Sequence, residues 1–387
     1  MKSIVMITLG LFVFSNTQSQ KNWQNYFDHR YMSLCTSGST FREDNLLKST
    51  TGNLYDFMSL SITVDALMNM YVATGNEEYL NDEIKIINNV LSTAAVSKSI
   101  PENIYSLKDD YLGWISQTPN YAYHYETELY EGYIFRYITQ FLYEIKKTGW
   151  KDRSAKNSEW YNTTLKFIEK NIWEKWISRS LRSKANPYGT FLSTRAHMAS
   201  HWAFTGLILK EISDNTEIKT QCQDVVNMFD LLLKRNLKPH PDFPDAYTWN
   251  STWDNVDGTQ ADLSLPPYVQ DVSHGNHVMG YIALSKRLNN PNWTNENILG
   301  FCNTIKQVLY NKTTMSFCDN VDGSTSIFNP GQGNSQADGW LKLGLFDGQT
   351  LNLYLNFALQ REDLLIKYGQ ELQYYAGLTL IEYLLAQ

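Results

Sequence analysis

Histidine residues gather in two short stretches of this chain. Residues 195–202 (RAHMASHW) contain two histidines four positions apart, and residues 268–277 (YVQDVSHGNH) contain two that are three positions apart. Side chains at these spacings point to the same face of an α-helix. If both stretches are helical, each one therefore presents a pair of imidazoles on one face.

These stretches contain the groups that β-elimination from a uronic acid requires. A base removes the proton next to the carboxylate, a polar or cationic group stabilises the enolate, and an acid protonates the leaving oxygen. A neutral imidazole is a suitable base, because its ordinary pKa lies near neutral pH. We expect His201 or His277 to be the base, and Asn276 with Arg195 to meet the carboxylate. Tyr268 is the expected acid because it neighbours the histidines, with Tyr247 and Tyr123 as alternatives.

Other roles are open for the same residues. Imidazoles on adjacent helices could hold a zinc ion, although no HExxH pattern occurs. A histidine on a helix more often caps, packs or forms hydrogen bonds than reacts. Asp271 and Ser273 could be N-caps of the helix that follows, and Arg195 could form a surface ion pair. We expect no cofactor, and a metal ion at the histidines is the alternative.

A glycoside hydrolase would instead need two carboxylates that flank the scissile bond. The candidates for these carboxylates are Glu126, Glu128, Asp254, Asp271 and Asp338. No motif selects two of them, and Asp271 could simply orient His274 or His277 by accepting an N–H.

The pentapeptide Asp-Asn-Val-Asp-Gly occurs twice, at residues 254–258 and 319–323. Alternating oxygen ligands followed by glycine suggest a calcium-binding loop. Neither copy continues into a twelve-residue loop with a terminal Glu. Turn formation explains Asp, Asn and Gly equally well, so both interpretations are kept.

Aromatic and polar side chains in the predicted loops could line a sugar-binding cleft. Flat rings offer large apolar surfaces for stacking, although the same rings could pack loops onto the helices. The residues that we expect to contact substrate are Tyr123, His124, His197, Trp202, Trp249, Trp253, His274, Gln332, Asn334 and Trp340.

Apolar residues at helical spacing predict an all-α chain, and strand signals are scarce. Long polar loops are expected at residues 101–127, 178–200, 238–276 and 311–349. The helices are expected at residues 53–71, 77–96, 128–147, 160–176, 202–212, 218–237, 278–288, 295–309, 351–358 and 362–385. Repeated helical hairpins of this kind suggest an (α/α) toroid, in which an inner and an outer ring of helices leave a cleft at one end.

Residues 55–80 resemble the first helical hairpin of (α/α)-toroid proteins, through Asp65, Tyr71, Gly75 and Tyr79. That resemblance implies a single toroid domain of six or seven hairpins. Toroids with this opening include glycoside hydrolases, sugar epimerases and polysaccharide lyases, so the resemblance bears on the fold more than on the function.

A second resemblance concerns the chemistry. Asn276-His277 resembles the Asn-His pair at the mouth of an inner helix in toroidal alginate and glucuronan lyases, and Ser200-His201 resembles a degenerate copy. It implies an acidic-polysaccharide substrate such as alginate or glucuronan. The chain departs from the family because no Arg-to-Tyr spacing of the family type follows His277. A glycoside hydrolase on the same fold and a non-catalytic glycan-binding protein are the alternatives.

Composition and the first residues indicate where the protein works. The chain has 387 residues and a net charge of −7, which does not favour nucleic-acid binding. Residues 1–19 predict a signal peptide, and no later stretch is long enough to cross a membrane. We expect a secreted or periplasmic monomer, with an irregular N-terminal arm at residues 20–52 and the toroid at 53–387. Among its four cysteines, Cys302 and Cys318 are the closest pair for a disulfide.

Overall fold

The computed structural model describes residues 22–387 except 121, 185, 194, 254–268 and 327–329. Within these residues the chain is mostly helical. The α-helices are α1 (Trp23–Tyr31), α2 (Phe41–Lys48), α3 (Phe57–Thr74), α4 (Glu77–Ser92), α5 (Glu128–Lys147), α6 (Ala155–Ile168), α7 (Lys175–Lys184), α8 (Ala196–Ile212), α9 (Thr216–Asn236), α10 (Val272–Arg287), α11 (Asn295–Asn303), α12 (Gly348–Gln360), α13 (Glu362–Lys367) and α14 (Glu371–Leu385).

Short helical turns and strands connect these helices. The turns are η1 (Leu54–Asp56), η2 (Ser97–Ser99), η3 (Trp150–Arg153), η4 (Glu169–Glu174), η5 (Thr304–Leu309), η6 (Gln332–Asn334) and η7 (Leu341–Leu345). The strands form antiparallel pairs, β1 (Ala95–Val96) with β2 (Leu112–Gly113), β3 (Lys238–Pro239) with β4 (Tyr247–Thr248), and β5 (Tyr310–Asn311) with β6 (Ser316–Phe317).

The all-α prediction is confirmed, and α5 has the predicted bounds. Its N-cap is Thr127, whose side chain accepts a hydrogen bond from the backbone of Tyr130. Acidic residues occupy its first turn and two lysines its last, which complements the helix dipole. Both α8 and α10 begin six residues earlier than predicted. That shift places all four clustered histidines on helices.

The prediction of an irregular segment at residues 20–52 is wrong for its described part, which forms α1 and α2. Thr40 and Glu43 make a reciprocal capping box at the start of α2. In α1, Trp23 stacks on Tyr375 of α14 with ring centroids 6.1 Å apart. The Trp23 indole also donates to Glu382 at 3.0 Å. These two contacts hold α1 against α14.

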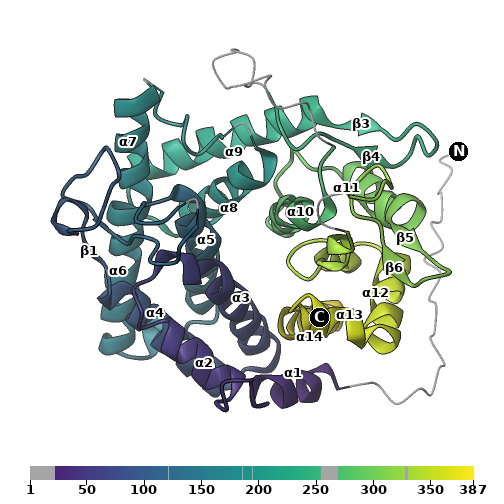
Figure 1. The fold of residues 1–387 in the computed structure, drawn as a ribbon, viewed down its shortest axis with the longest axis horizontal. Helices are drawn as coiled ribbons and strands as arrows, with labels where there is room; N and C mark the ends of the chain where they lie inside the picture. Colours follow the sequence, from purple (N-terminus) through teal and green to yellow (C-terminus); the bar gives the residue numbers. More distant parts are fainter. Residues whose placement is uncertain (1–21, 121, 185, 194, 254–268, 327–329) are drawn as a thin grey trace, which may run out of the picture.

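Several helices pack against one another in a closed order (Figure 1). Helix α3 packs against α14 and α5, α5 against α8, and α8 against α10, while α10 and α14 both contact η7. Helices α4, α6 and α9 pack on α3, α5 and α8 respectively. Side chains of α5, α8 and α10 that are distant in sequence are thus brought together.

Cys302 and Cys318, the closest cysteines in the sequence, do not form a disulfide. All four cysteines lie in the described residues and all are free thiols. Cys302 is buried, and its thiol points to the carbonyl of Leu343 at 3.9 Å. Among the described helices, none is both long and apolar enough to cross a membrane.

Candidate functional site

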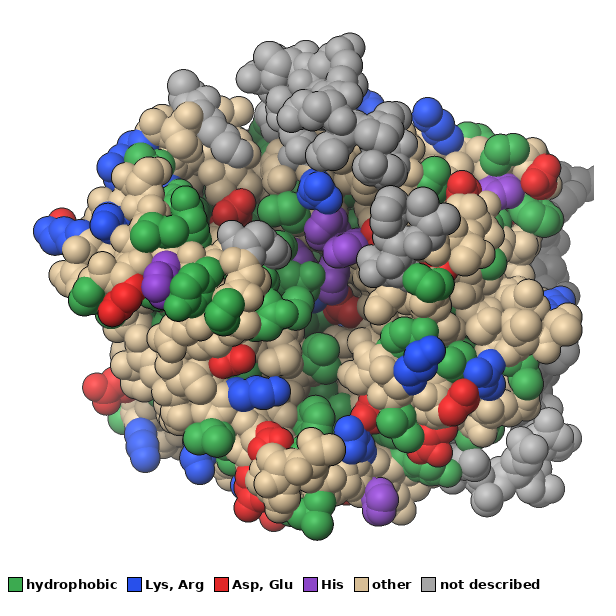
Figure 2. Space-filling model, viewed as in Figure 1, with side chains coloured by type: hydrophobic (Ala, Val, Ile, Leu, Met, Phe, Trp, Pro, Cys, Tyr) green, Lys and Arg blue, Asp and Glu red, His purple; other side chains and the backbone are tan. Residues whose placement is uncertain are grey.

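Five polar side chains meet where α5, α8 and α10 come together. Tyr133 and Arg136 extend from α5, His201 from α8, His277 from α10, and Asp338 from the segment between η6 and η7. We call them the inner cluster. Figure 2 shows histidine side chains gathered in a hollow near the middle of the face in view.

His277 links the two sides of the inner cluster. Its Nε2 lies 3.2 Å from the Tyr133 hydroxyl, and its Nδ1 makes a short contact with a carboxylate oxygen of Asp338. Because a carboxylate only accepts, Nδ1 carries the proton and Nε2 accepts from the Tyr133 hydroxyl. The result is an ordered chain of hydrogen bonds, Tyr133 to His277 to Asp338.

Arg136 completes this chain as a buried cation. Its Nη2 donates to the same Asp338 oxygen at 2.9 Å and lies 3.3 Å from Nδ1 of His277. Burial first, and then the charge of Arg136, lower the pKa of His277 well below its ordinary value. Burial raises the pKa of Asp338, and Arg136 opposes that rise. The His277 imidazole is therefore neutral at pH 7.

His201 lies deeper than His277 and is fully buried. Its ring centroid is 4.3 Å from that of Tyr133 and 4.9 Å from that of His277. No described group forms a hydrogen bond with either of its ring nitrogens. Burial, followed by Arg136, lowers its pKa well below the ordinary value. Of the two predicted bases, only His277 retains a partly exposed side chain.

A second group of side chains lies at the start of the same two helices. His197 of α8 and His274 of α10 approach with ring centroids 4.3 Å apart. Asp271 is the N-cap of α10 and accepts from the backbone of His274 at 2.9 Å and from its Nδ1 at 2.8 Å. Arg195 is the exposed N-cap residue of α8. We call these four residues the outer cluster.

The capping interpretation of Asp271 and Ser273 is only partly correct. Asp271 is the cap, and the Ser273 hydroxyl donates to it at 2.6 Å. Burial raises the pKa of Asp271, but the hydrogen bonds from His274 and Ser273 outweigh that effect and hold the pKa below its ordinary value. Asp271 is thus an ionised partner of His274.

The predicted contact of Asn276 with a substrate carboxylate needs correction. Its side-chain oxygen accepts from the backbone of Gly339 at 2.8 Å and of Trp340 at 3.1 Å. Gly339 lies so close to α10 that an added Cβ would stand 2.0 Å from the Asn276 carbonyl oxygen. Asn276 therefore holds the segment that carries Asp338, and its role is to position that carboxylate.

Five further residues expected to touch substrate are buried, which argues against that role. Trp202 stacks on Phe191, and the Trp340 indole donates to the Val272 carbonyl at 3.0 Å. Asn334 accepts from the Phe317 backbone at 3.0 Å and donates to Gly331. The buried set is Trp202, Trp249, Trp253, Asn334 and Trp340. These side chains pack the loops onto the helices.

Of the other predicted contacts, His197 is also buried, whereas the rest are at least partly exposed. The Tyr123 side chain is exposed and stacks on His124, whose φ of +62° is a left-handed conformation. Gln332 is exposed at the start of η6. Tyr268, the predicted acid, falls in the segment that is not described.

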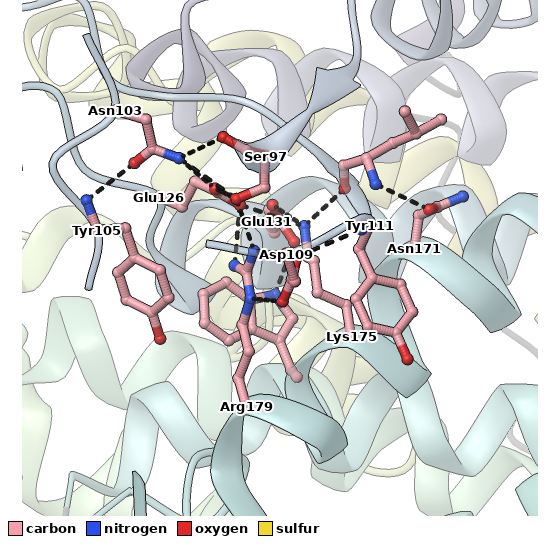
Figure 3. A network of polar contacts seen from close by, with 12 residues as sticks. Ser97, Asn103, Tyr105, Asp109, Tyr111, Glu126, Glu131, Asn171, Lys175 and Arg179 are labelled. Carbon is pink, nitrogen blue, oxygen red and sulfur yellow. Dashed lines mark hydrogen bonds and ion pairs between the residues drawn. The ribbon is translucent and has the colours of Figure 1, made fainter. Parts of the chain in front are cut away.

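A separate buried network fixes the loop that precedes α5 (Figure 3). Arg179 of α7 donates to Glu126 at 2.8 Å, and Lys175 donates to Glu131 at 2.6 Å. Asn103 also donates to Glu126 at 2.6 Å. With its oxygens occupied and its side chain fully buried, Glu126 is not available as a hydrolase carboxylate.

Metal ligands do not assemble in the part of the chain that the structure describes, where no three His, Cys, Asp or Glu side chains are grouped to hold an ion. At residues 319–323, Asp319 accepts from the backbones of Ser326, Gly331 and Gly333. The backbone of Gly323 donates to the Asn320 carbonyl at 2.9 Å, so this copy of the pentapeptide contains a turn. Its other copy, residues 254–258, lies outside the described residues.

Sequence reasoning missed Tyr133 and Arg136, although it placed them on a helix. The signal available was an arginine among apolar residues of α5, since a buried arginine nearly always has an acidic partner. No family model, curated protein or solved structure matches this chain.

Proposed function

We propose that this protein is an exported polysaccharide lyase that cleaves a uronic-acid-containing glycan by β-elimination. The observation that carries the proposal is the hydrogen-bonded order Tyr133–His277–Asp338. It supplies a neutral imidazole and a phenol side by side, as this elimination needs. Export rests on the signal-like residues 1–19 alone.

The two groups would divide the proton transfers of the reaction. Nε2 of His277 takes the proton from the carbon next to the carboxylate, and the electron pair moves into an enolate. The enolate then expels the glycosidic oxygen as the carbon–carbon double bond forms, and the Tyr133 hydroxyl protonates that oxygen. Transfer of the captured proton from His277 to Tyr133, across 3.2 Å, restores both groups.

Asp338 and Arg136 would support these transfers without touching the sugar. Asp338 fixes the imidazole by accepting from Nδ1 and stabilises it while it is protonated. Arg136 lies beside both groups and favours negative charge that develops nearby. Arg136 thus takes the charge-stabilising role that sequence reasoning gave to Arg195 and Asn276.

The toroid is part of the same proposal. Its support is the closed order of contacts through α3, α5, α8, α10, η7 and α14. A cavity is also lined by one or more residues from each of these elements, among them Asn69, Gln140, Phe204, Gly280, Lys342 and Leu380. In this arrangement the histidines would lie at one end of the inner helices.

The direct test is turnover of a panel of uronic-acid polymers by the purified mature chain. A lyase produces unsaturated uronate ends, which absorb ultraviolet light, and equal numbers of reducing ends. Reducing ends without unsaturation would establish the hydrolase alternative and refute the elimination. Saturable binding with neither product would establish the glycan-binding alternative.

A further inference from the structure

We propose that the outer cluster is a second carboxylate-binding subsite, so that the preferred substrate has two adjacent acidic sugars. The inference that the ligand is a polyuronate rests on the proposed function. Its evidence is the position, exposure and unsatisfied polar groups of the outer cluster.

The outer cluster lies between the inner cluster and solvent. On α10 and α8 its histidines precede those of the inner cluster by three and four residues, which corresponds to about 5 Å along a helix. The side chain of His274 is 47% exposed, whereas that of His277 is 15% exposed. One sugar unit at His277 would therefore place its neighbour near His274.

Two groups in the outer cluster have unused capacity for a ligand. His197 is buried, yet its Nδ1 has no hydrogen-bond partner among the described residues. Over the same residues, no ion pair or hydrogen bond is formed by the exposed side chain of Arg195. A buried nitrogen without a partner costs stability unless water or a ligand satisfies it.

The charges near the outer cluster favour an anion. The N-terminal ends of α8 and α10 both lie there, and the helix dipoles place partial positive charge at these ends. Asp271 is the opposing negative charge, and its oxygens are already engaged by the backbone and ring of His274 and by Ser273. Arg195 is therefore the cation available for an incoming carboxylate.

The two clusters also have different cations. Burial, then His274, and further the charge of Arg195 lower the pKa of His197. For His277, burial comes first and Arg136 is the cation whose charge lowers the pKa further. Arg136 is buried against Asp338 and His277, so it acts on the inner cluster, and the exposed Arg195 is the cation that can meet the sugar beside the one that reacts.

The test compares two tetrasaccharides, one of contiguous uronates and one of uronates that alternate with neutral sugars. Binding is measured by titration calorimetry in the Tyr133→Phe background, which prevents turnover. Arg195→Gln should weaken binding of the contiguous tetrasaccharide about tenfold or more, as expected for loss of a charge-assisted contact. It should leave the alternating one within about twofold.

The matched control is Arg235→Gln, which removes an exposed arginine from a different helix, α9, and should change the affinity for neither tetrasaccharide. Equal weakening of both ligands, or of neither, by Arg195→Gln would overturn the subsite. The two proposals fail separately. If Arg195→Gln weakens binding of the contiguous tetrasaccharide alone but no unsaturated product forms, the subsite is supported and the lyase function is refuted. If unsaturated product forms but both tetrasaccharides are affected equally, the lyase function is supported and the subsite is refuted.

Discussion

Replacement of Asp338 by Asn tests whether the inner cluster is held by a buried ion pair. The side chains of Arg136 and Asp338 are 2% and 4% exposed, and their atoms lie 2.9 Å apart. Removing one partner of such a pair leaves the other charge buried, which typically costs about 3–5 kcal/mol. His277 also loses its charged acceptor. We expect Asp338→Asn to lower the free energy of unfolding by about 3–5 kcal/mol.

The assay is urea unfolding followed by circular dichroism at neutral pH. Asp363→Asn is the matched control, because Asp363 pairs with Arg361 at 2.9 Å while its side chain is 64% exposed. Its loss should cost less than about 1 kcal/mol. A double variant that also carries Arg136→Met should be less destabilised than the sum of the single changes. If Asp338→Asn behaves like Asp363→Asn, the ion-pair reasoning is wrong.

Three other changes test two buried ionisable groups and one close backbone contact. The pKa of His201 is lowered in the folded protein, so the contribution of this residue to stability is complete above pH about 6.5 and is lost as the pH falls. Below that pH, His201→Phe should make the free energy of unfolding less dependent on pH, by up to about 1.4 kcal/mol per pH unit. Burial raises the pKa of Glu83 well above its ordinary value, so the wild-type protein loses stability as the pH rises above about 4.3. Urea unfolding at a series of pH values should therefore show that Glu83→Gln becomes more stable relative to wild type as the pH rises. Gly339→Ala, which meets α10 backbone, should cost at least about 1–3 kcal/mol in thermal or urea unfolding, whereas Gly348→Ala, with open space around it, should be nearly neutral.

The sequence predicted the fold class and α5 well because their signals are local. Thr127, the acidic first turn and the apolar spacing all agree on where α5 begins and ends. The starts of α8 and α10 were placed too late because His, Ser and Asn in their first turns interrupt the apolar pattern. Those polar residues face other polar residues in the protein, which periodicity alone does not reveal.

The partnership of the two histidine stretches was anticipated, and the structure brings them together as pairs. The partners of His277 could not be predicted in the same way. Tyr133 and Asp338 are 144 and 61 residues from His277, and no spacing rule connects them. Tyr133 also fits the apolar face of α5, so its hydroxyl gains a role only when α5 packs on α8 and α10.

The tryptophans were predicted to contact substrate, but they are buried, because the type of a residue does not indicate whether its side chain is exposed. Trp202 lies within a helix, and Trp249 and Trp340 pack on one another with ring centroids 5.8 Å apart. Each of these rings fills part of the protein core. Loop position in the sequence was therefore a poor guide to surface position.

Transfer of protons by Tyr133 and His277 in a β-elimination can be measured as the rate at which unsaturated uronate ends form. We expect Tyr133→Phe to lower kcat on a polyuronate by about 10²–10⁴-fold, because a phenyl ring cannot protonate the leaving oxygen. Tyr143→Phe, on the same helix, should leave the rate unchanged. Full activity in Tyr133→Phe would contradict the account.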